Sequence, residues 1–226
     1  MESQSAPSTK PLLGYWHIRG YGAYIKLAFA AVGVDFDYVP YYESDEAKWF
    51  QTDKPSLSMT LPNLPYLRDG DLEISEHDAI YRHVFRKYKP ELLGKTINDQ
   101  AQVDQFLTYW VKLNSALRTP CYTQSDPTED NRKAIIEPFR ATLDRLDARL
   151  ATRKYHMGDD LTAADIYLYE TFEVLKLIHE STANGWLNIK RVGESIETLG
   201  WFESYKKSQY YAEQINGDEA HINNRK

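Results

Sequence analysis

The chain has 226 residues, of which 42% are hydrophobic and 27% charged, with a formal net charge of -6 at pH 7. This length suits one large domain or two small ones, and it contains no run near the roughly 18 apolar residues of a membrane span. No block of Lys and Arg marks a nucleic-acid surface. The polar N-terminus lacks the pattern of a signal peptide, and Cys121 is the only cysteine. We therefore expect a cytoplasmic protein that binds neither nucleic acid nor a membrane.

The first part of the chain alternates strand and helix patterns. Residues 12–17 are typical of a short strand, residues 23–32 are rich in Ala, Leu and Ile and predict a helix, and Gly33 supplies a stop. Residues 34–42 alternate and predict a second strand. A strand, a helix and a strand at this spacing indicate a βαβ unit with a parallel pair.

A hairpin is predicted next. Asp69-Gly70 separates the apolar run 61–67 from the return strand 72–74, and Asp-Gly favours a type I′ turn because both central residues need positive φ. Ser75 is predicted to cap a helix, with Asp78 completing the capping pair. The order βαβ and then ββα is that of a thioredoxin-like domain, which is α/β with a mixed four-stranded sheet.

The second part shows only helical periodicity. Apolar residues recur at helical spacing from Val103 to Leu117, before Pro120, and from Ile135 to Leu150. Thr162 and Asp165 form a capping box that opens a third helix through Leu177, and a last helix is predicted over 201–212. We expect a thioredoxin-like domain at 10–89, a linker at 90–97, an all-helical domain at 98–216, and a polar, frayed tail at 217–226.

Pro65 marks a candidate peptide-binding edge. A cis Leu64–Pro65 bond turns the backbone of Leu64 outward, where its N–H and C=O can pair with an extended peptide. The helix that starts near Ser75 directs unsatisfied N–H groups toward the same place, which favours a carboxylate. Together they describe a site for a small acidic peptide, whereas the plainer interpretation is a turn proline.

Tyr15 is the candidate catalytic residue. It ends the first predicted strand before the Gly20-Tyr21-Gly22 turn, where side chains project into the crevice at the strand's carboxyl end. A hydrogen bond to a charged group contributes about 1.5–3 kcal/mol, so one bond from this hydroxyl lowers a thiol pKa of about 8.5 by one or two units. The alternative is an ordinary core or surface aromatic among 17 tyrosines.

Other chemistries lack a pattern. The six histidines show no HxxxH spacing and Cys121 has no CxxC context, so we expect no metal site. No Gly-rich phosphate loop and no Gly-x-Ser-x-Gly elbow occur, which argues against nucleotide binding and serine hydrolysis.

Four segments in order resemble the cytosolic glutathione transferases, and most closely the mu class, and the correspondence as a whole runs from about residue 11 to residue 211. They are GYWHIRG at 14–20, LPNLPYL at 61–67 with Asp69-Gly70, ISEHDAI at 74–80, and the set Gly158, Leu161, Thr162 and Asp165. The resemblance implies a dimeric enzyme that conjugates glutathione, its co-substrate, to small hydrophobic electrophiles.

The resemblance also implies residue roles. Tyr15 is the catalytic residue and donates its hydroxyl to the glutathione sulfur. Asn63, Leu64 and Pro65 form the segment that binds the tripeptide backbone, with Leu64 paired to the cysteinyl unit. The remaining implied residues are Trp16, Trp49 and Lys54 at the glycine end, Glu76 and His77 at the γ-glutamyl group, Tyr122 and Tyr21 at the electrophile site, and Arg82 and Arg86 at the dimer interface.

Four departures from the family pattern bear on these roles. His77 stands where the family has serine; a neutral imidazole donates one bond and a protonated one adds charge, so either sign of pH effect on binding is open. The segment between Tyr41 and Trp49 is short, and the arginine expected just before Trp49 is absent. Lys112 falls where the family has an acid that crosses the dimer interface.

Two other functions remain open at this stage. The chain can be a carrier of glutathione or apolar ligands without turnover, or a structural relative like the lens crystallins that resemble this family. Alternatively, it can use the same site for a glutathione-dependent isomerisation of a prostaglandin-like or ketosteroid-like substrate.

Overall fold

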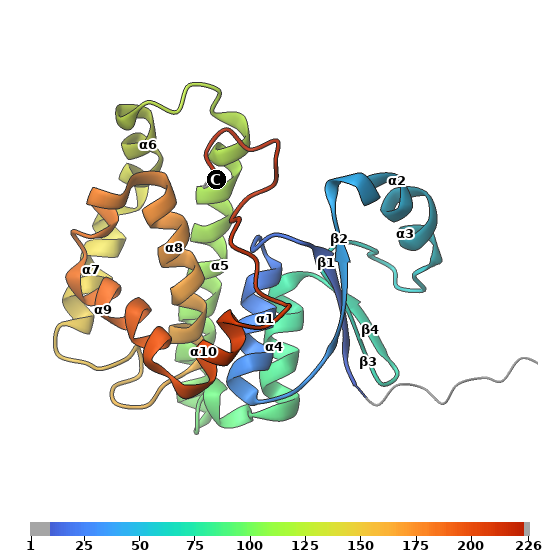
Figure 1. Cartoon of the computed structure of the whole chain (residues 1–226). Coiled ribbons are helices and arrows are strands. Elements are labelled where there is room, and N and C mark those ends of the chain that lie inside the picture. Colours follow the sequence, from blue (N-terminus) through green and yellow to red (C-terminus); the bar gives the residue numbers. More distant parts are fainter. Residues whose placement is uncertain (1–9, 224–226) are drawn as a thin grey trace, which may run out of the picture.

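The computed structural model describes residues 10–223, in which a four-stranded sheet is followed by a helical domain (Figure 1). The strand order is β2-β1-β3-β4. The strand β1 pairs parallel with β2 and antiparallel with β3, and β3 pairs antiparallel with β4. This is the predicted thioredoxin-like arrangement. The strands are β1 (Leu12–Trp16), β2 (Asp37–Tyr41), β3 (Tyr66–Asp69) and β4 (Leu72–Ser75).

Helices α1 (Gly22–Val32) and α4 (His77–Tyr88) lie between the sheet and the helical domain (Figure 1). The predicted stop at Gly33 is confirmed, because this residue takes the left-handed conformation at φ 69°. Short helical turns fill the segment between β2 and β3. They are a 3-10 turn at Glu43–Asp45, α2 (Glu46–Lys48), a π-helical turn at Trp49–Asp53, and α3 (Lys54–Ser56).

The helical domain is built around α5 and α8, which pack against each other in its centre (Figure 1). Among the described residues, no helix is both long and apolar enough to cross a membrane. The elements in chain order are a 3-10 turn at Pro90–Leu93, α5 (Ile97–Thr123), α6 (Glu129–Ile136), a 3-10 turn at Glu137–Phe139, α7 (Arg140–Leu150), α8 (Ala163–Ala183), α9 (Leu187–Ser195), a 3-10 turn at Ile196–Thr198, and α10 (Gly200–Lys206).

The predicted capping box at the start of α8 is confirmed. The Oδ2 atom of Asp165 accepts hydrogen bonds from the backbone N and the hydroxyl of Thr162, both at 2.8 Å. Its Oδ1 atom accepts from the backbone N of His156, also at 2.8 Å. The carboxylate is fully buried, so these donors offset its desolvation and fix the start of α8.

Two predicted helix limits were wrong. Ser75 does not cap α4; it ends β4 and its hydroxyl donates to the carbonyl of Leu61, so the helix begins after Glu76. The first helix of the second half does not stop before Pro120 but runs through Thr123. Its last turn is stabilised from outside, because the backbone N–H groups of His221 and Ile222 donate to the carbonyl of Cys121.

Two further limits shifted for local reasons. A 3-10 turn containing Pro138 divides the predicted helix at 135–150 into α6 and α7. The last helix, predicted over 201–212, ends at Lys206. Beyond it, the Tyr210 hydroxyl donates to the carbonyl of Phe36 at 2.9 Å, which ties this segment to the strand domain.

The tail was predicted to be frayed, and for its described part this was wrong. Asn216 is fully buried, and its side-chain N–H donates to the carbonyl of Ile222 at 2.9 Å. Upstream, the backbone N–H groups of Arg19 and Gly20 donate to the carbonyls of Gln214 and Ile215 at 2.7 and 2.9 Å. The C-terminal segment therefore covers the turn that follows β1. Residues 224–226 lie outside the described part.

Lys26 on α1 supports the end of β1 through a tyrosine. Its side chain is 1% exposed, and its Nζ donates to the Tyr38 hydroxyl at 3.0 Å. That hydroxyl in turn lies 3.1 Å from the carbonyl of Trp16 and 3.3 Å from that of Tyr15. Burial lowers the pKa of Lys26 to about 7, against a smaller opposing effect of Glu170.

We predict that Lys26→Met stabilises the protein most at low pH. The folded-state pKa lies below the unfolded value of 10.5, so between these values the unfolded chain binds more protons and wild-type stability rises with pH. Urea unfolding at pH 6 and pH 9 is expected to show that the advantage of the variant shrinks by about 2 kcal/mol across this interval. A constant difference contradicts the prediction. Lys206→Met, at an exposed position, is the control.

Candidate active site

Tyr15 lies at the carboxyl end of β1, in the position predicted for the catalytic residue. Its side chain is 5% exposed, and its Oη accepts a hydrogen bond from the backbone N–H of Tyr21 at 2.9 Å. The turn comes this close only because it contains two glycines. A Cβ at Gly20 would lie closer than 3.0 Å to this Oη, and a Cβ at Gly22 closer than 3.0 Å to the ring.

The surroundings keep the Tyr15 hydroxyl protonated. Burial raises the pKa of Tyr15, while the Tyr21 N–H and the positive charge of Arg118 act in the opposite direction. The net shift is upward, so the phenol is neutral near pH 7 and retains a proton that it can donate. A phenol used in this way is a hydrogen-bond donor, and it does not act as a base.

Leu64 belongs to the same small apolar cluster as Tyr15. This cluster is separate from the main core and also contains Trp49 and Tyr66. The Leu64–Pro65 bond is cis, which is the condition on which the predicted peptide edge depended. Within residues 10–223, the N–H and C=O of Leu64 pair with no other backbone group. Asn63 beside it is exposed.

The start of α4 carries an unusual backbone conformation. Glu76 has φ 68°, the one positive φ at a non-glycine residue in the described part of the chain. Such conformations cost about 1–3 kcal/mol and cluster at functional sites. The Glu76 side chain is exposed, and α4 begins at the next residue with its first N–H groups unpaired along the helix. This end of α4 is therefore suited to an anionic group.

The ring of His77 turns toward the helical domain. It stacks on Tyr21 with 4.3 Å between ring centroids, and its Nε2 lies 3.0 Å from the Tyr167 hydroxyl. Burial is the main cause that lowers the pKa of His77 to about 4. The imidazole is consequently neutral near pH 7, so the positive charge that was left open from the sequence is not present there.

The residues implied for the glycine end of the tripeptide are not all at the surface. Trp49 is 2% exposed, and its ring lies parallel to that of Tyr66 with 6.1 Å between centroids. Trp16 is half-buried and packs edge-on against Tyr41. Lys54 is half-buried at the start of α3, with its Nζ 5.5 Å from the Phe50 ring centroid. Trp49 is thus buried within the cluster, while Trp16 and Lys54 remain accessible.

Tyr122, on α5, and Tyr21, in the β1–α1 turn, are both close enough to Tyr15 to act on it electrostatically. The Tyr122 hydroxyl accepts the backbone N–H of Gly217 at 2.9 Å, so the C-terminal segment is attached here too. Tyr21 is half-buried between His77 and Arg118, whose Cζ lies 5.5 Å from the Tyr21 ring centroid. The predicted electrophile side is therefore aromatic, but it also contains a cation.

Sequence analysis missed Arg118. It is 4% exposed on α5, and its Nη2 donates to the carbonyl of Gly20 at 3.1 Å. The signal that could have found it is its position four residues after Asn114, on the helix face that carries Leu117 and Cys121. A charged residue on a buried helix face is rare without a partner or a function.

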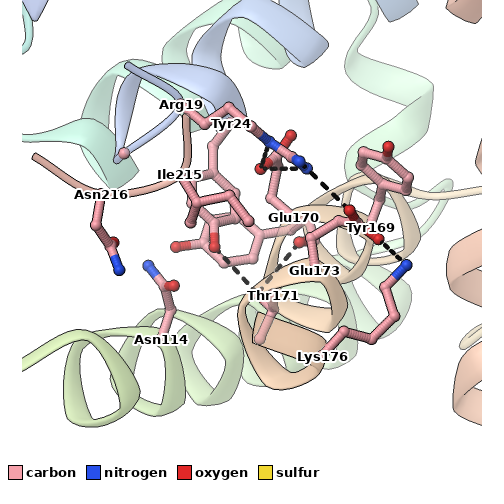
Figure 2. A network of polar contacts seen from close by, with 12 residues as sticks. Arg19, Tyr24, Asn114, Tyr169, Glu170, Thr171, Glu173, Lys176, Ile215 and Asn216 are labelled. Carbon is pink, nitrogen blue, oxygen red and sulfur yellow. Dashed lines mark hydrogen bonds and ion pairs between the residues drawn. The ribbon is translucent and has the colours of Figure 1, made fainter. Parts of the chain in front are cut away.

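Arg19, which lies in the turn between β1 and α1, is a second buried cation (Figure 2). Its Nε donates to Glu170 at 3.1 Å and its Nη1 to Glu173 at 3.3 Å, both on α8. Lys176 pairs with the other oxygen of Glu173. This network joins the β1–α1 turn to the helical domain.

Arg82 and Arg86, implied for the dimer interface, behave differently within one chain. Arg82 donates to Asp104 at 3.1 Å and to Asp78 at 3.2 Å, whereas Arg86 is exposed. Lys112 is exposed on α5 and borders a hollow of about 380 Å³. Tyr15 does not line this hollow. Its lining residues are Asp104, Gln105, Thr108, Tyr109 and Lys112.

We predict that Gly22→Ala disrupts the site by displacing the Tyr15 ring, because the new methyl overlaps it. Overpacking of this kind costs about 1–3 kcal/mol. Thermal unfolding is expected to show this loss. The control is Gly200→Ala, where the added methyl meets no atom within 4 Å. Equal melting temperatures of Gly22→Ala and the wild type would contradict this placement of the ring.

Both domains of this chain are similar to known proteins. The family description "Glutathione S-transferase, N-terminal domain" matches residues 11–86, and "Glutathione S-transferase, C-terminal domain" matches residues 129–206. The chain is 32% identical over 206 residues to a glutathione S-transferase of Tyrophagus putrescentiae, covering 89% of this chain and 92% of that protein. It is 26% identical over 204 residues to glutathione S-transferase Mu 1 of Macaca fascicularis, covering 88% and 91%.

A solved structure supports the same fold. The crystal structure of the glutathione S-transferase Blo t 8 superposes with a TM-score of 0.81 at 20% identity, covering 93% of this chain and 99% of that one. The sequence relatives extend over both domains and therefore over the whole arrangement around Tyr15. The chain belongs to the glutathione S-transferase family, with mu-class enzymes among its relatives.

Proposed function

We propose that this enzyme conjugates the glutathione thiolate to hydrophobic electrophiles, and that the Tyr15 hydroxyl keeps the sulfur anionic. One observation carries the proposal: the Tyr15 Oη already accepts the Tyr21 N–H at 2.9 Å. Within residues 10–223, its own O–H has no acceptor at hydrogen-bond distance. That proton is therefore available to a ligand sulfur in front of the ring.

We infer the binding roles from the positions of these residues. The backbone of Leu64, between Asn63 and Pro65, pairs with the cysteinyl unit by strand addition. Glu76 and the backbone N–H of His77 bind the γ-glutamyl group at the start of α4, where the helix dipole favours a carboxylate. Trp16 and Lys54 hold the glycine end, and Trp49 supports them from within the apolar cluster.

We assign glutathione binding mainly to the first domain and electrophile binding mainly to the second. Residues 10–89 bind glutathione, residues 98–216 line the electrophile site through Tyr122 and, from the other domain, Tyr21, and residues 90–97 link them. We place this activity in the cytoplasm. Conjugation then depends on a thiolate held next to a bound electrophile, a case of nucleophilic attack promoted by positioning.

We predict that Tyr15→Phe retains glutathione but loses most conjugation near pH 7. Loss of a hydrogen bond to an anion costs about 1.5–3 kcal/mol, which corresponds to roughly 10- to 100-fold in rate. Initial rates with a chloro-dinitrobenzene substrate and retention on a glutathione resin measure the two properties separately. The control is Tyr155→Phe, which removes a hydroxyl between α7 and α8.

Unchanged turnover of Tyr15→Phe would remove this residue from the mechanism. Retention of the wild type on the resin, with no activity toward several electrophiles, would instead favour a carrier. The absorbance of the bound thiolate across a pH series shows whether a variant has a smaller fraction of ionised glutathione. A variant with a normal thiolate fraction but slow conjugation has lost electrophile binding instead.

We further propose that two copies pair through α4 and α5. Arg86 and Arg82 both lie on α4, and Arg86 is exposed. Arg82 donates hydrogen bonds to Asp104 and Thr108, two of the residues that line the hollow along α5. The hollow is lined by both apolar and charged groups, and protein–protein interfaces combine the same two kinds of group. Lys112 borders it and adds a positive charge.

We predict that Arg86→Glu weakens self-association. Reversing a charge at an interface changes its electrostatic complementarity, and we expect the dissociation constant of the pair to rise by about tenfold or more. Sedimentation velocity over a concentration series measures this constant. Arg153→Glu, an exposed position in the α7–α8 connection, is the matched control. A wild type that sediments as a single chain at all concentrations would refute the dimer.

A further inference from the structure

Arg118 is a buried cation whose hydrogen-bond partners within residues 10–223 are all neutral. Its side chain connects α5, the β1–α1 turn and the C-terminal segment. Figure 2 shows two of the partners, Asn114 on α5 and Asn216 of the C-terminal segment, facing each other below Tyr24. The acceptors are Asn114 Oδ1 at 3.1 Å, Asn216 Oδ1 at 2.7 Å, and the carbonyls of Ile215 at 3.3 Å and Gly20 at 3.1 Å.

The charge of Arg118 is not balanced by a direct ion pair. Within residues 10–223, no carboxylate oxygen lies within 4.0 Å of its guanidinium nitrogens. Glu170 acts on it from a greater distance, but that carboxylate is held by Arg19 at 3.1 Å. A buried charge without a counter-ion is costly, and it favours an anion in its neighbourhood.

Arg118 lies near the Tyr15 hydroxyl. Gly20, whose carbonyl accepts from Arg118, is the residue at which a Cβ would touch the Tyr15 Oη. The Tyr21 ring lies 5.5 Å from the Arg118 Cζ, and the Tyr21 N–H is the donor to that same Oη. Two sources of positive potential, one charge and one N–H dipole, therefore converge on this oxygen.

Other titratable groups facing Arg118 do not cancel its charge. Tyr24 from α1 and Tyr122 from α5 have pKa values raised by burial, and His77 from α4 has its pKa lowered, so all three are neutral near pH 7. Burial lowers the pKa of Arg118, but the neighbouring phenols and Glu170 more than offset this, so the guanidinium stays charged.

We propose that Arg118 is a positioning residue whose charge, which no carboxylate within residues 10–223 pairs directly, makes the place in front of the Tyr15 hydroxyl prefer an anionic sulfur to a neutral one. The inference deepens the proposed function and rests on it. When glutathione binds, its S–H bond breaks, the electron pair stays on sulfur and the proton passes to solvent. The thiolate then accepts the Tyr15 hydrogen bond in the positive potential of Arg118.

The test compares two ligands that differ in charge at sulfur. Glutathione sulfonate is anionic there, and S-methylglutathione is neutral. Titration calorimetry at pH 7 gives the ratio of their dissociation constants for each variant. The decisive variant is Asn114→Asp, which is isosteric and places a carboxylate against Arg118. Because the Nδ2 of Asn114 has no partner within the described residues, the substitution removes no hydrogen bond there.

We expect Asn114→Asp to weaken the sulfonate at least tenfold while the S-methyl ligand changes less than threefold. Arg118→Gln is expected to do the same, and Arg118→Lys, which keeps the charge, to retain most of the preference. Thermal unfolding of each variant accompanies the titrations. If Arg118→Gln does not fold, the isosteric Asn114→Asp and the charge-retaining Arg118→Lys decide the question.

Equal losses for both ligands would mean that Arg118 acts only structurally, and no change in either would mean that its charge does not reach the sulfur; both overturn the inference. A wild type that binds neither ligand overturns the proposed glutathione site and this inference together. A wild type that binds both with the expected preference, but conjugates nothing, overturns the catalytic proposal alone.

Discussion

The hydrogen bond from the Tyr21 N–H to the Tyr15 hydroxyl is the contact on which the site depends. It requires a turn that folds back onto the ring of the preceding strand residue, and only glycine at positions 20 and 22 leaves the space. Because the oxygen accepts this bond, its own proton is directed elsewhere. The hydroxyl of a nearly buried phenol is thereby held in a fixed orientation, in the same apolar cluster as Leu64.

The turn is held mainly by the other domain. Arg19 reaches Glu170 and Glu173 on α8 (Figure 2), and Arg118 on α5 bonds the carbonyl of Gly20. The C-terminal segment closes the arrangement, since Gln214 and Ile215 accept from the backbone of the same turn. The position of the Tyr15 hydroxyl is consequently a property of the packed pair of domains, and the thioredoxin-like sheet does not determine it alone.

Local sequence signals were enough for the order of the elements and for the place of Tyr15 near the end of the first strand, because strand periodicity and glycine stops act over a few residues. The predicted type I′ turn was wrong: Asp69 pairs with Leu72, so the central residues are Gly70 and Asp71, and of these only Gly70 has a positive φ. Local signals also failed where a distant partner decides. Ser75 has the composition of a helix cap, yet its hydroxyl is taken by the carbonyl of Leu61. Pro120 is a local helix stop, yet α5 continues past it. The N–H groups of His221 and Ile222, a hundred residues away in the sequence, donate to the Cys121 carbonyl and stabilise the last turn. Arg118 could not be predicted for the same reason, because its hydrogen-bond acceptors come from three separate segments of the chain.

The sign of the charge at the site is set by which carboxylates are already paired. The chain as a whole carries -6, so an anionic sulfur would be disfavoured if that charge were spread evenly. Near Tyr15, however, the carboxylates of Glu170 and Glu173 are bound by Arg19, and Lys176 pairs with Glu173 as well. His77 is neutral near pH 7, and in the described part of the chain Arg118 has only neutral acceptors. What remains at the Tyr15 hydroxyl is one buried positive charge together with a backbone N–H, and both favour the thiolate that we propose to bind there.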